Sequence, residues 1–141
     1  MLLGTYQHSL DAKNRIVIPA KLMEELKGKL YIYPAASGTC IKLYDEAQWN
    51  RYCTVIDSLP PEKKYAVQAM IYPVSQQVEP DAQNRVPIPQ AMLTKAGITG
   101  KNIVTVGMGS CCEIWNQEKY EARQQTAPTP EIADFLASMG F

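Results

Sequence analysis

The chain has few of the side chains that enzymes and metal proteins use for chemistry. His8 is the only histidine, and the four cysteines lack the CxxC or HxxxH spacing of a zinc site. The string GMGSCC at residues 107–112 has neither the lysine of a phosphate-binding loop nor the GxSxG of a nucleophile elbow. We therefore expect no catalytic residue, no metal and no cofactor. An enzyme that pairs a cysteine with His8 is kept as an alternative hypothesis.

Long apolar runs are also missing. Nowhere are eighteen consecutive residues apolar, and the first residues show no positively charged region followed by an apolar stretch. We therefore expect a soluble, cytoplasmic protein that is not exported. The cysteines are too few for a disulfide scaffold, and Cys111 and Cys112 are adjacent, so we expect reduced, buried thiols.

What the chain does contain is a repeat. The segment DAKNRIVIP at residues 11–19 returns as DAQNRVPIP at 81–89, and CIKLYDEAQW at 40–49 faces CCEIWNQEKY at 111–120. Because both matches keep their order and nearly their separation, the chain is one folded unit of roughly 70 residues written twice. A unit of that size is marginal alone, which favours two copies that share one core.

Charge is balanced overall but not along the chain. Fourteen basic residues match fourteen acidic ones, which argues against a polycation that coats nucleic acid. Residues 1–70 hold nine Lys or Arg against seven acids, and 71–141 hold five against seven, so the copies carry +2 and −2. If one face of the protein binds phosphate, we expect the first copy to supply most of the positive charge on that face.

Hydrophobic periodicity predicts the same elements in both copies. Residues 6–10 and 16–18 alternate as two strands of a tight hairpin around the turn at 11–14, and a helix follows Pro19. The further predicted strands are 30–33, 40–44, 77–79, 85–88, 103–106 and 112–115. The further predicted helices are 45–52, 61–71, one after Pro89, and an amphipathic one over 132–139. The stripe of this last helix must pack on the chain's own core or on a neighbour.

The turn residues have chemistry suited to their place. Asp11 and Asp81 can accept hydrogen bonds from the backbone two residues on, and Asn14 and Asn84 can adopt the left-handed conformation. We expect these four residues to structure the two hairpins.

Arg15 and Arg85 leave these turns at the start of a strand. An arginine fork suits phosphate or the O6 and N7 edge of guanine. The alternative is that each arginine pairs with the aspartate four residues earlier and braces the turn, and both roles can coexist. Lys13 lies at the first tip, where the second copy has Gln83.

Three lysines after the first hairpin extend this candidate site or belong to an ordinary solvated helix face. They are Lys21, Lys27 and Lys29. The candidate DNA-binding residues are Lys13, Arg15, Arg85 and Lys21.

With the twin D-x-x-x-R motifs, the Ile-Pro that follows each and the opening GTYQHSLD, the chain resembles the MraZ family of bacterial transcriptional regulators over essentially its whole length. The resemblance implies an α+β fold with a mainly β core: a pseudo-two-fold, swapped-hairpin barrel of two AbrB-like repeats, assembled into a homo-oligomeric ring. It also implies binding of double-stranded DNA at G-rich direct repeats upstream of the division and cell-wall operon, generally as a nucleoid-associated repressor. The family often has glycine where this chain has Asn14 and Asn84.

The expected organisation follows from the repeat. Residues 1–57 form the first AbrB-like repeat, 58–74 a helical connector, 75–127 the second repeat, and 128–141 the amphipathic C-terminal helix. Membrane and small-molecule partners are not expected. A second function remains open, a protein-interaction module such as an antitoxin of the same fold class, in which the C-terminal helix covers a partner.

Overall fold

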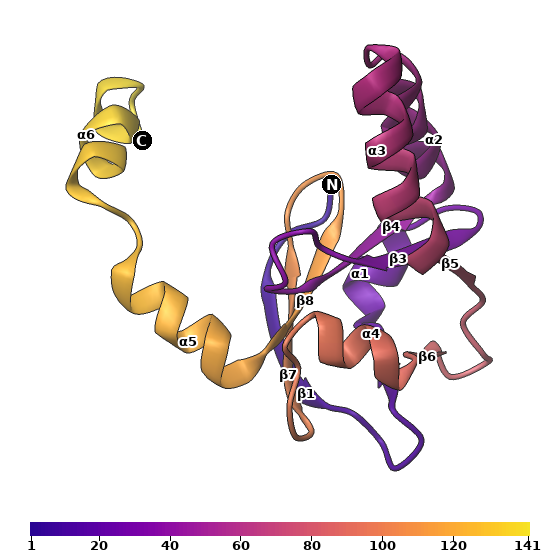
Figure 1. Cartoon of the computed structure of the whole chain (residues 1–141). Coiled ribbons are helices and arrows are strands. Elements are labelled where there is room, and N and C mark those ends of the chain that lie inside the picture. The colour runs from indigo at the N-terminus through magenta and orange to yellow at the C-terminus, as the bar shows by residue number, and fades with distance from the viewer.

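The computed structural model describes all 141 residues and has an α+β fold (Figure 1). Its strands are β1 (Thr5–Ser9), β2 (Arg15–Val17), β3 (Leu30–Pro34), β4 (Ile41–Asp45), β5 (Gln76–Val78), β6 (Arg85–Pro87), β7 (Asn102–Gly107) and β8 (Cys112–Asn116). Its helices are α1 (Ala20–Glu25), α2 (Glu46–Asp57), α3 (Pro61–Ile71), η1 (Tyr72–Val74), α4 (Gln90–Lys95), α5 (Gln117–Thr126) and α6 (Pro130–Ser138). No helix is long and apolar enough to cross a membrane.

The two copies exchange strands. Six strands form an antiparallel sheet in the order β1-β7-β8-β4-β3-β5, and β2 pairs with β6 in a separate ribbon. The first strand of each copy therefore lies beside the third strand of the other copy: β1 pairs with β7, and β5 pairs with β3. The sheet joins the copies again at its centre, where Ile41 of β4 is opposite Ile114 of β8. Neither half can keep this sheet without the other.

The predicted hairpin is wrong in its strand pairing, although its turn is correct. The amide of Asn14 donates to the carbonyl of Asp11 at 3.0 Å, and the amide of Asp11 donates to the carbonyl of Arg15 at 3.0 Å. Beyond that turn the strands separate, because Leu10 donates to Lys101 of the other copy at 2.8 Å and β2 pairs with β6. Burial explains the choice: Ile16 of β2 meets Val86 of β6, and both are almost fully buried.

One core lies between the sheet, the ribbon and the two short helices that follow the ribbon strands. It includes Ile16 and Val86 from the ribbon, Leu22 from α1 and Met92 from α4. Pro19 and Pro89 lie at the N-caps of α1 and α4 with extended backbone, one position before the first turn that was predicted for Pro19, and each helix starts directly after its proline. A second, aromatic cluster lies under α2 and α3, where Tyr31 stacks on Trp49 with ring centroids 5.0 Å apart.

The end of the chain differs most from expectation. The helix α5 was not predicted, because its sequence QEKYEARQQT has no apolar stripe; Asn116 caps it by accepting from the amide of Lys119 at 3.2 Å. The predicted amphipathic helix is present as α6, but it contacts no part of the chain's own core and stands away from the body (Figure 1).

The histidine and the cysteines have structural surroundings. His8 is partly buried, and its Nε2 lies 2.7 Å from the hydroxyl of Thr105. All four cysteines are free; Cys40, Cys111 and Cys112 are buried as predicted, whereas Cys53 is only half-buried, which differs from the prediction. Burial raises the pKa of Cys40 to about 11 and that of Cys112 to about 12, so both stay protonated at neutral pH. No cluster of three metal-ligating side chains occurs.

Candidate nucleic-acid interface

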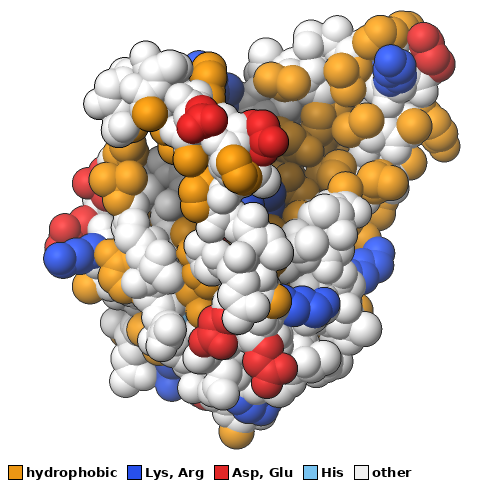
Figure 2. Space-filling view, turned by 90° about the vertical axis from the view of Figure 1, so that its left-hand side faces the viewer, with side chains coloured by type: hydrophobic (Ala, Val, Ile, Leu, Met, Phe, Trp, Pro, Cys, Tyr) orange, Lys and Arg blue, Asp and Glu red, His pale blue; other side chains and the backbone are white.

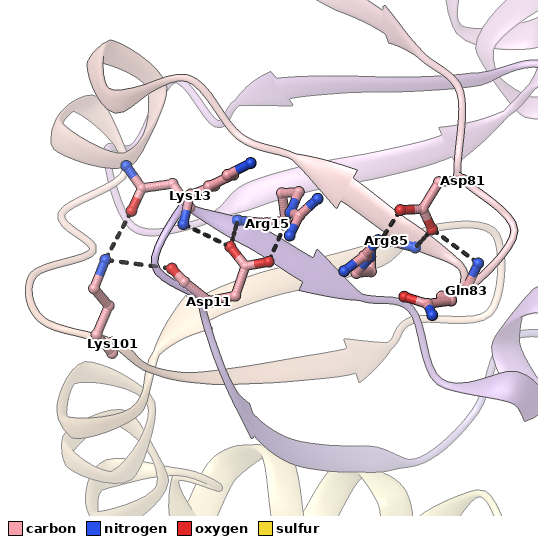
Figure 3. A network of polar contacts seen from close by, with 8 residues as sticks. Asp11, Lys13, Arg15, Asp81, Gln83, Arg85 and Lys101 are labelled. Atoms are coloured by element: carbon pink, nitrogen blue, oxygen red, sulfur yellow. Dashed lines mark hydrogen bonds and ion pairs between the residues drawn. The ribbon is translucent and has the colours of Figure 1, made fainter.

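The ribbon β2–β6 places both motif arginines on one face. Its register pairs Arg15 with Pro87, Ile16 with Val86, and Val17 with Arg85. Because side chains alternate along a strand, Ile16 and Val86 point into the core while the other four point outward. Arg15 and Arg85 are therefore diagonal neighbours, with Cα atoms roughly 7–8 Å apart. Figure 3 shows their side chains lying between the two turns.

Each arginine is held by its own aspartate. Oδ1 of Asp11 accepts from the amides of Lys13 at 2.8 Å and Arg15 at 2.9 Å, while Oδ2 accepts from Nε of Arg15 at 2.6 Å (Figure 3). Asp81 repeats this pattern with Gln83 and Arg85, and its Oδ2 is 2.7 Å from Nε of Arg85. The predicted brace is thus confirmed in both copies.

The ion pair with aspartate leaves the two terminal nitrogens of each guanidinium without a hydrogen-bond partner. The carboxylates use Nε, and neither guanidinium donates any other hydrogen bond from its two terminal nitrogens. The side chain of Arg15 is 27% exposed and that of Arg85 is 32% exposed. An aimed guanidinium with two free nitrogens on an exposed face can bind an acceptor pair on a ligand.

The aspartates are ionised throughout the neutral range. The backbone amide of Arg15 is the largest cause that lowers the pKa of Asp11 to about 2, and the Arg15 side chain and the amide of Lys13 add to it. The pKa of Asp81 is lowered by the amide of Arg85 and by the same two further kinds of contact. Each turn therefore keeps its negative brace at any pH where the protein would meet a ligand.

The asparagines adopt the backbone predicted for them. Asn14 has φ of 57° and Asn84 has φ of 60°, both in the left-handed region. Only small polar residues and glycine enter this region at low cost, which explains why the turn is DAKN in one copy and DAQN in the other.

Replacing Asn84 tests this backbone requirement without disturbing other contacts, because the Asn84 side chain makes no hydrogen bond. Asn84→Ala should lower the free energy of unfolding by about 1–2 kcal/mol, since alanine has no compensation for the left-handed conformation. Asn84→Gly is the matched control and should change it by less than about 1 kcal/mol. Urea unfolding of the two variants measures the difference. Equal values for alanine and glycine would contradict the role assigned to φ.

Lys101 was missed in the sequence and belongs to the first turn. Its Nζ donates to Oδ1 of Asn14 at 2.9 Å and lies 3.5 Å from the carbonyl of Asp11 (Figure 3). The amide nitrogen of Asn14 also donates to Oε1 of Gln90 at 3.2 Å. No equivalent side-chain contact supports the second turn, so the first tip has more hydrogen bonds and more positive charge nearby. Nothing local in the sequence signals a contact between residues 87 positions apart.

The side chains of the other predicted lysines take no part in this network, although the backbone amide of Lys13 does. Lys13 is exposed at the first tip, and Lys21, Lys27 and Lys29 are exposed on α1 and the loop after it. None of these four side chains makes a hydrogen bond or an ion pair within the chain. They fit a solvated face, and their part in binding stays a prediction.

Comparison with known proteins gives a consistent result. A family model described as "MraZ protein, putative antitoxin-like" matches residues 1–68 and 72–135. A protein of Clostridium beijerinckii called transcriptional regulator MraZ is 36% identical over 143 residues, covering 99% of each chain. Relatives with the same description are 38% identical in Clostridium botulinum, covering 85% of this chain and 84% of the relative, and 34% identical in Ligilactobacillus salivarius, covering 86% and 85%.

Proposed function

The chain belongs to the MraZ family, and from that premise we propose that it is a sequence-specific DNA-binding transcriptional regulator. Its relatives carry the description of transcriptional regulators, not of enzymes. In this proposal the protein is a cytoplasmic, nucleoid-associated ring of identical subunits. It binds G-rich direct repeats upstream of its own operon and represses the division and cell-wall genes there.

The single observation that carries the proposal is the paired-arginine face of the β2–β6 ribbon. Two guanidinium groups, each with its Nε held by a carboxylate, share one exposed face. The major groove of DNA admits a two-stranded ribbon, and an arginine fork matches O6 and N7 of guanine in that groove. Holding the fork in place before binding reduces the entropy lost on contact.

Energetics favour several subunits acting together. One bidentate contact between arginine and guanine gives about 1–3 kcal/mol of discrimination. A specific site needs roughly 4–10 kcal/mol over random DNA. A ring that presents the same ribbon to repeated sites adds such contacts and gains effective concentration without extra charge. The balanced net charge of the chain is then no obstacle.

In this proposal the first copy makes the stronger contacts with DNA. Its tip carries Lys13, and Lys101 supports its turn, whereas the second tip carries Gln83 and has no equivalent support. We therefore assign Arg15 the main base contact, Lys13 and Lys21 phosphate contacts, and Arg85 a weaker contact.

We also propose, from the same family membership, that the chain has the AbrB-type architecture. The exchanged pairs β1–β7 and β3–β5, together with the shared ribbon, support an AbrB-type swapped-hairpin barrel. In this proposal the repeats are residues 1–57 and 75–127, joined by 58–74 and followed by the terminal helix at 128–141.

A gel shift over a range of salt concentrations tests the function. The probe is a duplex from the chain's own upstream region with G-rich direct repeats, and the control is the same duplex with scrambled repeats. We expect selective binding that weakens by about 10³-fold or more between about 50 and 200 mM salt if six or more phosphates are contacted. Equal affinity for both duplexes, or no response to salt, would sink the proposal.

A further inference from the structure

The side chain of Asn14 is held at both ends of its amide by residues of the second copy. Its Oδ1 accepts from Nζ of Lys101 at 2.9 Å, and its Nδ2 donates to Oε1 of Gln90 at 3.2 Å. Gln90 is the first residue of α4, and Lys101 directly precedes β7, so neither belongs to the first copy. We call these two hydrogen bonds the Asn14 clamp.

The two partners of the asparagine are themselves fixed. The carbonyl of Lys101 accepts from the amide of Leu10 at 2.8 Å, and its Nζ lies 3.5 Å from the carbonyl of Asp11. On α4, Nε2 of Gln90 lies 3.4 Å from the hydroxyl of Thr94 and donates to it. The clamp therefore connects the first turn to the sheet on one side and to a helix on the other.

The second turn has no counterpart of Gln90. Ala20 follows the first motif as Gln90 follows the second, and a methyl group cannot accept a hydrogen bond. Asn84 has the same backbone conformation as Asn14, with φ of 60° against 57°, but its side chain makes no hydrogen bond. The two turns thus share their backbone and differ in what holds the asparagine.

The position of Lys101 is also filled differently at the second turn. Leu10 lies opposite Lys101 where β1 continues its pairing with β7, and the residue equivalent to Leu10 is Pro80. Continuing the pairing of β3 with β5 by two residues brings Gly28 opposite Pro80. Glycine has no side chain to reach the turn, and proline has no N–H to donate. The second copy therefore holds the first turn, and the first copy does not hold the second turn in the same way.

Lys101 reaches the turn from the side opposite the arginine. In Figure 3 its ammonium group lies beside Asp11 and Asn14, whereas the side chain of Arg15 extends from the other side of the turn toward the second motif. Asn14 directly precedes Arg15 in the chain, so fixing the asparagine also fixes the backbone from which the guanidinium extends. A lysine placed in this way affects the arginine through the turn.

The placement of each arginine matters because the chain has little general attraction for DNA. Fourteen basic residues are balanced by fourteen acidic ones. On the face drawn in Figure 2, basic side chains are scattered among acidic and uncharged ones and form no continuous patch. Attraction to phosphate that is independent of sequence is therefore weak, and discrimination depends on how well a base contact is arranged before binding.

We propose that Lys101 and Gln90 are positioning residues for the base contact of Arg15, and that they act through the side chain of Asn14. The inference rests on the proposed function, because it requires that Arg15 contacts DNA. The copies then have different roles: the first carries the main reading turn, and the second holds that turn in place. Glycine at position 14 would adopt the same backbone but would provide no side chain for the clamp.

Three substitutions remove the clamp in different ways, and one matched control leaves it intact. Lys101→Met removes a donor and a charge, Gln90→Met removes an acceptor and no charge, and Asn14→Gly removes the side chain but keeps the left-handed backbone. Asn84→Gly is the control, because its side chain has no partner. Affinity of each full-length variant for the G-rich and the scrambled duplex is measured between about 50 and 200 mM salt. Circular dichroism verifies folding.

We expect each of the three substitutions to reduce the preference for the G-rich duplex by about 10-fold. One hydrogen bond contributes a factor of about 2 to 10, and every subunit loses it. The double variant of Lys101→Met and Asn14→Gly should behave like Asn14→Gly alone, because glycine has already removed the acceptor. Asn84→Gly should keep the wild-type preference, and Lys101→Met should keep the wild-type salt dependence.

A direct contact between Lys101 and a phosphate predicts a different pattern. Lys101→Met would then weaken binding to both duplexes equally and reduce the salt slope by about one, while Gln90→Met would change nothing. That pattern would overturn the proposal. So would a loss of preference in Asn84→Gly as large as that in Asn14→Gly.

Hydrogen exchange of the free protein separates failure of this proposal from failure of the proposed function. In the wild type the amides of residues 13 and 15 should be more strongly protected than those of 83 and 85, and Lys101→Met should remove the difference. Equal protection of the two wild-type turns would overturn the positioning role alone. A protected first turn in a wild type that binds both duplexes equally would overturn the proposed function, and the positioning role with it.

Discussion

Arg15→Ala should abolish the gel shift of the G-rich repeat duplex while the oligomer stays intact. The substitution removes the aimed fork, which gives about 1–3 kcal/mol per guanine contact, and every subunit loses it at once. The fold should survive, because Arg15 is on the outer face of the ribbon and its backbone hydrogen bond to Asp11 does not need the side chain. Gel shift and gel filtration of the same preparation provide the two measurements.

Two matched variants make this result specific. Arg51→Ala removes a positive charge from an exposed position of α2 that makes no ion pair, and it should leave binding almost unchanged. Arg85→Ala should weaken binding less than Arg15→Ala, because the second tip lacks both Lys13 and the bridge from Lys101. Normal binding by Arg15→Ala, or an equal loss with Arg51→Ala, would contradict the role of the ribbon.

Ile16→Ala should lower the free energy of unfolding by about 2–5 kcal/mol, the usual cost of removing a large buried side chain. Ile16 is 1% exposed and lies directly under the arginine face, opposite Val86. Its loss leaves a cavity where the two copies meet, so the whole domain should become less stable. The midpoint of urea unfolding, followed by circular dichroism, measures the change.

The neighbouring residue provides the control for this prediction. Val17 is 48% exposed on the outer face of the same strand, so Val17→Ala should change the free energy of unfolding by less than about 1 kcal/mol. Similar effects at residues 16 and 17 would mean that the ribbon does not alternate between core and solvent as described.

Much of the local structure could be predicted, because its causes are local. Aspartate that accepts backbone amides and asparagine at positive φ produce the turn wherever they occur, so the DxxNR motif was interpreted correctly twice. Proline at the helix starts and the hydrophobic periods placed most helices and strands within a residue or two. The helix α5 was missed, since it has no apolar period to detect, and so was the short η1; α2 also continues to Asp57, beyond its predicted end at residue 52.

These local rules could not predict which strands pair with each other. The residues of β1 and β2 would suit a hairpin with each other, yet β1 pairs with β7 and β2 with β6. The backbone hydrogen bonds of a strand can be satisfied by any neighbour of compatible register, so burial across the whole chain makes the choice. The same choice brought Lys101 to Asn14 across 87 positions.

The sequence by itself determined that one unit is written twice, that each copy carries an arginine on an aspartate-braced turn, and that this pattern belongs to the MraZ family. Only the tertiary structure decided that Arg15 and Arg85 share one face, and that α6 is left without a surface in its own chain. The reason is physical: turn geometry and helix caps depend on a few adjacent residues. The pairing of distant strands depends on which apolar side chains the whole chain can bury together. The same holds for whether an apolar helix face is covered.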